Sequence, residues 1–462
     1  MQFVANLRNE TLDAFAAEAI QPRAYLLSSH RVTPATLEAA RRVRELGLPL
    51  FADNGTKELI DRTIDGFAAA AAPIADEIRT IRRELGRVPR GSDVPPDLQR
   101  RAKELADGVI DHATSLSDAV DPAALLELQL SMRPTDLIAQ EDFATACLLG
   151  LGLERETTGF SVDRFATRNR RSLRLWTAVK NDPRCAGLRV YAVLSAVDFN
   201  TARAAGRLAA AHGVRFAALG IAGINRDSFA TDFFVIGRGS HRLARAAPRR
   251  YVRLIQILLG LATGVREAGG SLDRFHCLGL GAAVMFPLPA VSFAECTALS
   301  TDATSPIHDA IRDQVYYELT RQGGRVSTSE IANRELRDEP WSFASPFEQQ
   351  FRQDFGHDVA AAKAWWTARG EPEITRDHLR ADVELSTALP LLGEHTSEVR
   401  RRGERVRVAA NHWRVGELAD VFSAAEGRHE RARAVLAELS AGQSTIVTRG
   451  VEAATEILAA TA

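Results

Sequence analysis

Two aspartates occupy positions where a carboxyl group can do chemistry. Asp53 ends an apolar run and is followed by a tight turn at 54–56, and Asp302 comes just past another apolar run, before a proline, Pro306, that is suited to opening a helix. A carboxyl that is partly desolvated at such a place can act as an acid, a base or a nucleophile. The alternative for each aspartate is a purely structural role as the cap of a turn or helix.

A third apolar run, at 136–139, is followed by Gln140 and then by the adjacent acids Glu141 and Asp142. If the strand persists, these two side chains point to opposite sides, so that one of them faces the same space as the other acids. Taken singly, each acid is more often a cap or a solvated turn residue. Acids at three separate strand ends favour a common site.

The elements that must position these acids follow from the hydrophobic pattern. The first 325 residues alternate short apolar or β-branched runs with longer helical patterns, which is typical of an α/β fold with a parallel sheet. The predicted strands are Ala24–Ser28, Leu48–Ala52, Leu126–Leu130, Asp136–Ala139, Arg189–Leu194, Arg215–Gly220, Phe275–Gly279 and Cys296–Ser300. Eight strands favour a closed (β/α)8 barrel, in which reactive groups project from the carboxyl ends of the strands.

We therefore predict a TIM barrel over residues 1–325. A long insertion at about 56–122, after the second predicted strand, is expected to shape the mouth of the barrel. After about Gly323 the strand signal fades, and helical periodicity appears in 347–369 and 409–439. Residues 326–462 are accordingly predicted to form a helical C-terminal domain.

Composition limits the classes of function. The 462 residues are 45% hydrophobic with a net charge of −1, and neither a leader pattern nor an apolar stretch of membrane-spanning length is present, so we expect a globular cytoplasmic protein with no membrane partner. Cys147, Cys185, Cys277 and Cys296 are widely spaced, which predicts buried free thiols and no metal site. The Gly279-Leu280-Gly281 segment lacks the rest of a dinucleotide fingerprint, so no cofactor is expected.

Several segments resemble those of the tRNA-guanine transglycosylases. The stretch from Tyr191 to Arg203 and on through Phe216 to Gly223 is similar to the central strand–helix–strand block of that family. Within it, Leu219–Ala222 resembles the Gly-Gly-Leu-Ala segment, with one glycine instead of two. Phe51–Thr56 resembles the segment Asp-Ser-Gly-Gly-Phe, and it is closer still to DNA-acting relatives that insert 7-deazaguanines. His276–Gly281 looks like the penultimate strand, and the order of the segments agrees from roughly Tyr25 to Ala310.

The resemblance implies a pentosyltransferase that replaces guanine in DNA or tRNA with a 7-deazaguanine base. By position, Asp302 would be the nucleophile and Asp53 the general acid and base. The base-binding residues would be Glu141 or Asp142, Ser195, Gly220, Ile221 and Ala222, with Glu141 preferred by register. Two departures concern the Cys-rich zinc site, which is absent, and the glutamine of the fifth strand, which is replaced by Leu194 or Ser195.

Binding to a nucleic acid would need local clusters of arginine, because the net charge is close to zero. Candidates for the backbone contacts are Arg168, Arg171, Arg245 and Arg249, with solvated helix faces as the alternative. Trp365, Trp366 and Trp413 could stack on unpaired bases, although their helical spacing favours a core role. Two other functions stay open: a non-catalytic partner subunit of a transglycosylase, and an unrelated barrel hydrolase acting on a small molecule. The protein could also form a homodimer.

Overall fold

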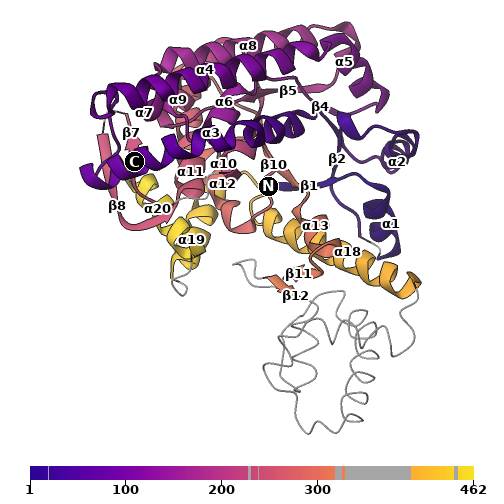
Figure 1. Ribbon diagram of the computed structural model, residues 1–462. Helices are drawn as coiled ribbons and strands as arrows, with labels where there is room; N and C mark the ends of the chain where they lie inside the picture. The colour runs from indigo at the N-terminus through magenta and orange to yellow at the C-terminus, as the bar shows by residue number, and fades with distance from the viewer. Residues whose placement is uncertain are drawn as a thin grey trace, which may run out of the picture. The chain divides into compact units, whose positions relative to one another are not determined.

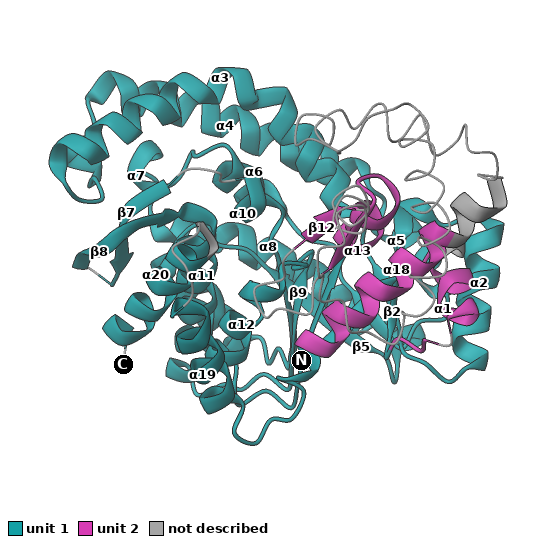
Figure 2. Cartoon of the chain, turned by 90° about the horizontal axis from the view of Figure 1, so that it is seen from below, with its two compact units in different colours: residues 1–6, 23–303, 419–462 teal, residues 7–22, 304–418 magenta. Residues whose placement is uncertain are grey.

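A computed structural model describes residues 1–18, 20–226, 230–237, 239–317, 325–327, 397–441 and 446–461 of the chain. The chain divides into two compact units, which Figure 2 distinguishes by colour. Unit 1 comprises residues 1–6, 23–303 and 419–462, and unit 2 comprises residues 7–22 and 304–418.

Unit 1 contains a closed barrel of eight parallel strands, so the expected α/β barrel architecture is confirmed. Around the barrel the strands are β1 (Gln2–Asn6), β10 (Ala298–Ala303), β9 (Arg274–Leu278), β6 (Phe216–Gly220), β5 (Arg189–Leu194), β4 (Asp136–Ile138), β3 (Leu50–Asp53) and β2 (Tyr25–Ser28). The first and last of these strands in the sequence pair with each other, with Val4 opposite Asp302. This pairing closes the barrel.

Seven of the eight predicted strands are confirmed, but the strand at Leu126–Leu130 is wrong. That segment lies in helix α5 (Pro122–Ser131), where Asp121 accepts a hydrogen bond from the Ala123 amide and Pro122 occupies the first helical turn. A short apolar run looks the same in a buried helix and in a buried strand. The eighth strand is β1 at the N-terminus, which the prediction omitted, so the segment at 56–122 follows the third barrel strand and not the second.

The described residues of unit 1 also form helices. They are α2 (Pro34–Glu45), α3 (Thr56–Leu85), α4 (Pro96–Ala119), α5, α6 (Ala144–Gly150), α7 (Arg155–Thr158), α8 (Val162–Lys180), α9 (Phe199–Ala211), α10 (Ala222–Arg226), α11 (Arg249–Glu267), α12 (Pro287–Ser292), α19 (Arg428–Ser440) and α20 (Ile446–Thr461). The long helices α3 and α4 run side by side (Figure 1). A hairpin of β7 (Ala230–Ile236) and β8 (Gly239–Pro248) precedes α11.

The helical C-terminal domain predicted for 326–462 lies largely outside the described residues, including 347–369 with Trp365 and Trp366. Its described helices α19 and α20 belong to unit 1. The buried Arg428 at the start of α19 donates hydrogen bonds to the carbonyl oxygens of Cys296 (2.6 Å) and Phe422 (2.9 Å). The bond to Cys296 ties this C-terminal region to the segment before β10.

Unit 2 is smaller and contains α1 (Asn9–Ala17), α13 (Ser305–Ile311), the hairpin of β11 (Val315–Tyr317) and β12 (Arg325–Ser327), and most of α18 (Ser397–Asp420), which carries Trp413. The buried Asn411 of α18 accepts a hydrogen bond from the Tyr317 amide and donates one to the carbonyl of Val315, both at 2.9 Å. One amide side chain thereby fixes the hairpin against the helix.

Two further expectations concern the whole chain. All four cysteines are buried free thiols, as expected. In the described part of the chain, no helix has both the length and the apolar character needed to cross a bilayer.

Candidate active site

The side chains that point into the barrel change from apolar to small or polar toward the carboxyl ends of the strands. Successive inward residues of a strand are two positions apart, and the inner core holds apolar side chains such as Val4, Leu26, Phe51, Val193 and Ala218. Two positions further on, the inward layer is small or polar. It contains Asn6, Ser28, Asp53, Ser195, Gly220 and Asp302, the last of which lies two positions after Ser300. We call this layer, together with Glu141 just after β4, the mouth of the barrel.

Asp302 lies inside β10 and is buried. Its Oδ1 accepts a hydrogen bond from the Gly279 amide at 3.0 Å and lies 3.3 Å from Nε2 of His276, and its Oδ2 accepts one from Nδ2 of Asn6 at 3.3 Å. Gly279 has a φ of 83°, a left-handed conformation that glycine adopts without strain. Two N–H groups and the His276 ring thus converge on this carboxyl group and fix its orientation.

His276 is fully buried and is held in place from both sides. Its Nδ1 lies 2.8 Å from the hydroxyl of Ser300, and its ring stacks on Phe51 with 5.2 Å between the centroids. A hydrogen on Nε2 satisfies both contacts, because Ser300 can then donate to Nδ1 while Nε2 donates to Asp302. This arrangement keeps the Asp302 carboxylate fixed.

Asp53 ends β3 and lies near Asp302. Its Oδ2 accepts hydrogen bonds from the Ser28 hydroxyl (2.7 Å) and from the Gly55 amide (3.1 Å). Burial raises the pKa of Asp53 above its ordinary value, and the charge of Asp302 raises this pKa further, while the two hydrogen bonds oppose the rise. A carboxyl in this environment holds a proton more readily than one in water.

The turn after Asp53 is anchored to the neighbouring strand. Asn54 donates a hydrogen bond to the carbonyl of Ala139 at 2.8 Å, and its Oδ1 accepts from both the amide and the hydroxyl of Thr56. Because Ala139 immediately follows β4, this bond holds the end of β3 against the segment that carries Glu141.

The structure separates the two adjacent acids. Glu141 is buried with 4% exposure, and its pKa is raised to about 8 by burial and, to a lesser extent, by the charges of Asp53 and Asp142. Asp142 instead accepts hydrogen bonds from Nη1 of Arg168 (3.2 Å) and from the Ala144 amide (3.2 Å). Of the two adjacent acids, Glu141 is therefore the one whose pKa responds to the charge of Asp53.

The other predicted base-binding residues also lie at this end of the barrel. A Cβ atom on Gly220 would be 3.9 Å from Oε1 of Glu141, so glycine leaves the space beside that carboxyl open. The backbone of Ser195 is held by Asn169 through bonds of 3.0 and 2.8 Å, while its buried hydroxyl has no hydrogen-bond partner among the described residues. Ile221 donates its amide to the carbonyl of Leu278 (3.2 Å), and Ala222 begins α10.

The four arginines predicted for a nucleic-acid backbone do not form one group. Arg168 and Arg171, on α8, engage Asp142 and Asp118. Arg249 is buried and binds Glu154, whereas the exposed Arg245 on β8 lies 3.9 Å from Glu452.

Three residues of the site escaped the sequence analysis in this role: Asn6, Ser28 and His276. Asn6 belongs to the omitted strand β1, where the inward alternation after Val4 would have indicated it. Ser28 and His276 lie in predicted strands, but their partners are more than twenty residues away in the sequence. No local signal identifies such pairs.

The geometry defines a (β/α)8 barrel whose mouth holds the carboxyl groups of Asp53, Glu141 and Asp302. Within the described residues, no group of three or more His, Cys, Asp or Glu side chains is arranged to hold a metal ion. No protein-family model matches the chain, and no match is found among curated proteins.

Proposed function

We propose that the protein is a base-exchange transglycosylase, which replaces guanine in a nucleic acid with a 7-deazaguanine through a covalent glycosyl-aspartate intermediate. The observation that carries this proposal is the different surroundings of two neighbouring acids. Asp302 accepts hydrogen bonds from Gly279 and Asn6 and lies against the His276 ring, whereas Asp53 has a raised pKa. A double displacement needs two carboxyl groups with different tasks, one that attacks and one that exchanges a proton.

In the first step a carboxylate oxygen of Asp302 attacks the anomeric carbon, and the bond from this carbon to the guanine nitrogen breaks. The electron pair goes to the leaving base, which takes a proton from Asp53, so that the base departs neutral. A glycosyl ester of Asp302 remains. The incoming base then gives its proton to Asp53 and attacks the same carbon, which releases Asp302 and restores both acids.

The hydrogen bonds of Asp302 contribute to this step by orientation. Gly279, His276 and Asn6 come from β9 and its turn and from β1, which flank β10 in the barrel. They fix the carboxylate before substrate binds, so less reorganisation is needed when it attacks.

Recognition of the base would fall to the opposite side of the mouth. Glu141, Ser195 and Gly220 offer a carboxyl, an unpartnered hydroxyl and an open space. Polar atoms that are buried without partners favour a ligand that supplies the missing hydrogen bonds. The edge of a guanine or 7-deazaguanine carries both donors and acceptors for these groups.

The test is base exchange with purified protein. DNA and tRNA that contain labelled guanine are incubated separately with an unlabelled 7-deazaguanine, and released guanine is counted. Release from one polymer, together with a covalent protein–nucleic acid adduct of the expected mass, supports the proposal and identifies the acceptor. If neither polymer releases guanine and no adduct forms, the proposal is wrong.

A further inference from the structure

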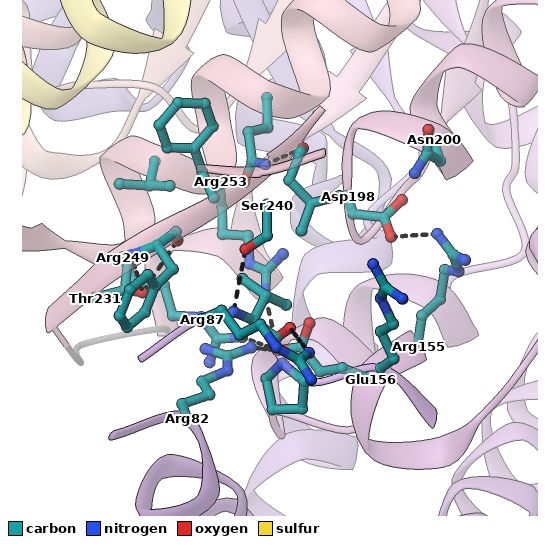
Figure 3. Close-up of a pocket in the computed structure, with 18 of the residues that line it drawn as sticks. Arg82, Arg87, Arg155, Glu156, Asp198, Asn200, Thr231, Ser240, Arg249 and Arg253 are labelled. Carbon is teal, nitrogen blue, oxygen red and sulfur yellow. Dashed lines mark hydrogen bonds and ion pairs between the residues drawn. The ribbon is translucent and has the colours of Figure 1, made fainter. Parts of the chain in front are cut away.

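A second site lies outside the mouth. A pocket of about 480 Å³ is bordered by the end of α3 and the loop after it, by α7, by the β5–α9 connection, by the β7–β8 hairpin and by α11. Its volume is within the range of pockets that hold small molecules. None of the mouth residues lines it. Figure 3 shows its side chains.

Arginine is the prominent residue type of this pocket. The lining includes Arg82, Arg87, Arg90, Arg155, Arg249 and Arg253, which come from four separate parts of unit 1. Glu156 and Asp198 are the lining carboxylates. Arginine is suited to phosphate because its planar N–H groups match the geometry of phosphate oxygens.

Several N–H groups of these arginines have no acceptor in the described part of the chain. Arg90 is exposed, and among the described residues its guanidinium forms no ion pair, although its charge contributes to lowering the pKa of Asp93. Arg155 donates to Asp198 at 2.9 Å, but its buried Nε lacks an acceptor in the described part of the chain. The same holds for Nε of Arg253, a residue that is only 6% exposed. A buried donor without an acceptor is costly unless a ligand satisfies it.

The helix that carries Arg253 adds to the positive potential. Helix α11 has 19 residues, starts with Arg249 and Arg250, and has no acidic residue in its first turn and no side-chain cap. The N-terminus of a helix bears a positive partial charge, so arginines there are unfavourable unless anions lie nearby. Glu154 offsets part of this charge by binding Arg249 and Arg253. Burial lowers the pKa of Arg253 to about 9, so it is still a cation at pH 7.

The wall contributed by the β7–β8 hairpin includes an apolar strip, Phe233, Phe234 and Val235, besides Thr231 and Ser240. The Phe234 ring is stacked on His241 with 5.0 Å between centroids. Amide side chains of Asn200 and Gln256 also line the pocket. A ligand with a phosphate at one end and a flat or sugar-like body at the other matches this division.

We propose that this pocket binds the phosphate group of a nucleotide, with Arg90, Arg155 and Arg253 as the phosphate ligands and the β7–β8 wall against the nucleoside. The nucleotide is either a free one or a unit of a nucleic-acid strand, since both present the same phosphate. The inference goes beyond base exchange and does not depend on it.

Calorimetric titration of the full-length protein with uridine 5′-diphosphate and with uridine tests the proposal. A uracil nucleotide avoids confusion with the guanine site proposed at the mouth. We expect the diphosphate to bind with a Kd of roughly 1–100 μM and uridine at least about ten times more weakly. Arg90→Gln, at an exposed residue whose loss does not threaten folding, and Arg155→Lys and Arg155→Gln are compared with the wild type. Arg184→Gln is the matched control, because Arg184 is an ion-paired arginine of unit 1 outside the pocket.

Each result of these titrations either supports the proposal or contradicts it. Weaker diphosphate binding by roughly tenfold in Arg90→Gln and Arg155→Gln, with Arg155→Lys intermediate and Arg184→Gln unchanged, supports the proposal. Competition by a single-stranded oligouridylate then indicates a strand as the source of the phosphate, and lack of competition indicates a free nucleotide. The proposal is overturned if the diphosphate does not bind, if uridine binds equally well, or if Arg90→Gln binds like the wild type. Since no turnover is measured, failure of base exchange would leave this result unaffected.

Discussion

The mouth of the barrel and the arginine pocket differ in the charges that surround their buried ionisable side chains. At the mouth, the groups that act most strongly on Glu141 besides burial are the carboxylates of Asp53 and Asp142, and Asp53 in turn is affected by Asp302. In the pocket, the buried Arg249 and Arg253 each face Glu154. Like charges are gathered in the first region, and opposite charges are paired in the second.

This difference matches the two roles that we propose, a reactive site at the mouth and a binding site in the pocket. Gathering carboxyl groups destabilises the folded protein but raises their pKa values, which suits proton transfer at neutral pH. Pairing cations with carboxylates compensates most of the cost of burial, and only a few N–H groups are left for a ligand. Neutralising an acid should therefore stabilise the protein at the mouth and destabilise it in the pocket.

The largest expected effect is on Asp302→Asn. Asparagine keeps the size of the side chain but cannot attack the anomeric carbon, so base exchange should fall by roughly a thousandfold or more and the covalent adduct should disappear. Labelled-guanine release and adduct mass are measured. Asp273→Asn is the control, since Asp273 precedes β9 at the opposite end of the barrel and pairs with Arg215. Wild-type exchange in Asp302→Asn would show that another residue is the nucleophile.

Asp53→Asn should slow exchange by a factor of about 100 to 10,000, which is typical when a general acid–base group is lost. The nucleophile is still present, so some adduct can form. Rates are compared with guanine and with a base analogue whose leaving group needs no proton. If the analogue is slowed as much as guanine, Asp53 does not transfer the proton.

On the pocket side, Glu154→Gln should lower the free energy of unfolding by roughly 3 kcal/mol, because two buried arginines lose a carboxylate. Denaturant unfolding at pH 7 provides the measurement. Glu127→Gln is the control: Glu127 also binds an arginine, Arg184, but at the surface, where such a pair contributes little. Equal changes in the two variants would contradict the pairing argument.

At the mouth, Glu141→Gln should raise the free energy of unfolding at pH 8.5 by roughly 2–4 kcal/mol. The sign follows from the raised pKa of about 8 in the folded protein. Between pH 4.5 and 8 the unfolded chain releases the Glu141 proton while the folded protein keeps it, so the wild type loses stability as pH rises. Unfolding at pH 5 and pH 8.5 should show this loss in the wild type and a smaller one in the variant. An unchanged pH dependence would mean that Glu141 is ionised in the fold.

The smallest effect concerns Gly279, whose amide binds Asp302. Gly279→Ala should lower the free energy of unfolding by roughly 1–2 kcal/mol, because alanine is strained at this positive φ. No steric clash adds to this cost, since the new Cβ would lie 3.7 Å from Ile221, an ordinary contact distance. Gly66→Ala is the contrasting control. Gly66 lies in α3 with open space around its Cβ position, so alanine should stabilise the protein by roughly 0.5–1 kcal/mol. Thermal unfolding of both variants is compared with the wild type.

The sequence by itself determined the class of fold, a closed barrel of parallel strands. Apolar runs that end in acids indicated where strands stop, and Asp53 and Glu141 lie close enough for the charge of one to affect the pKa of the other. Local pattern was sufficient there because the period of two in a strand is written in the sequence. It was not sufficient for Leu126–Leu130, where a short apolar run is compatible with helix or strand, or for the short strand β1.

Only the tertiary structure decided which side chains share an environment. The barrel places neighbouring strands side by side whatever their separation in the sequence. It thereby brings together three pairs: Asp302 with Gly279, Asp302 with Asn6, and Asp53 with Ser28. The arginine pocket has the same origin, since Arg90 and Arg155 follow different strands. A pKa and a buried unpaired donor depend on burial and on neighbours in space, and these are properties of the packed molecule that no local pattern contains.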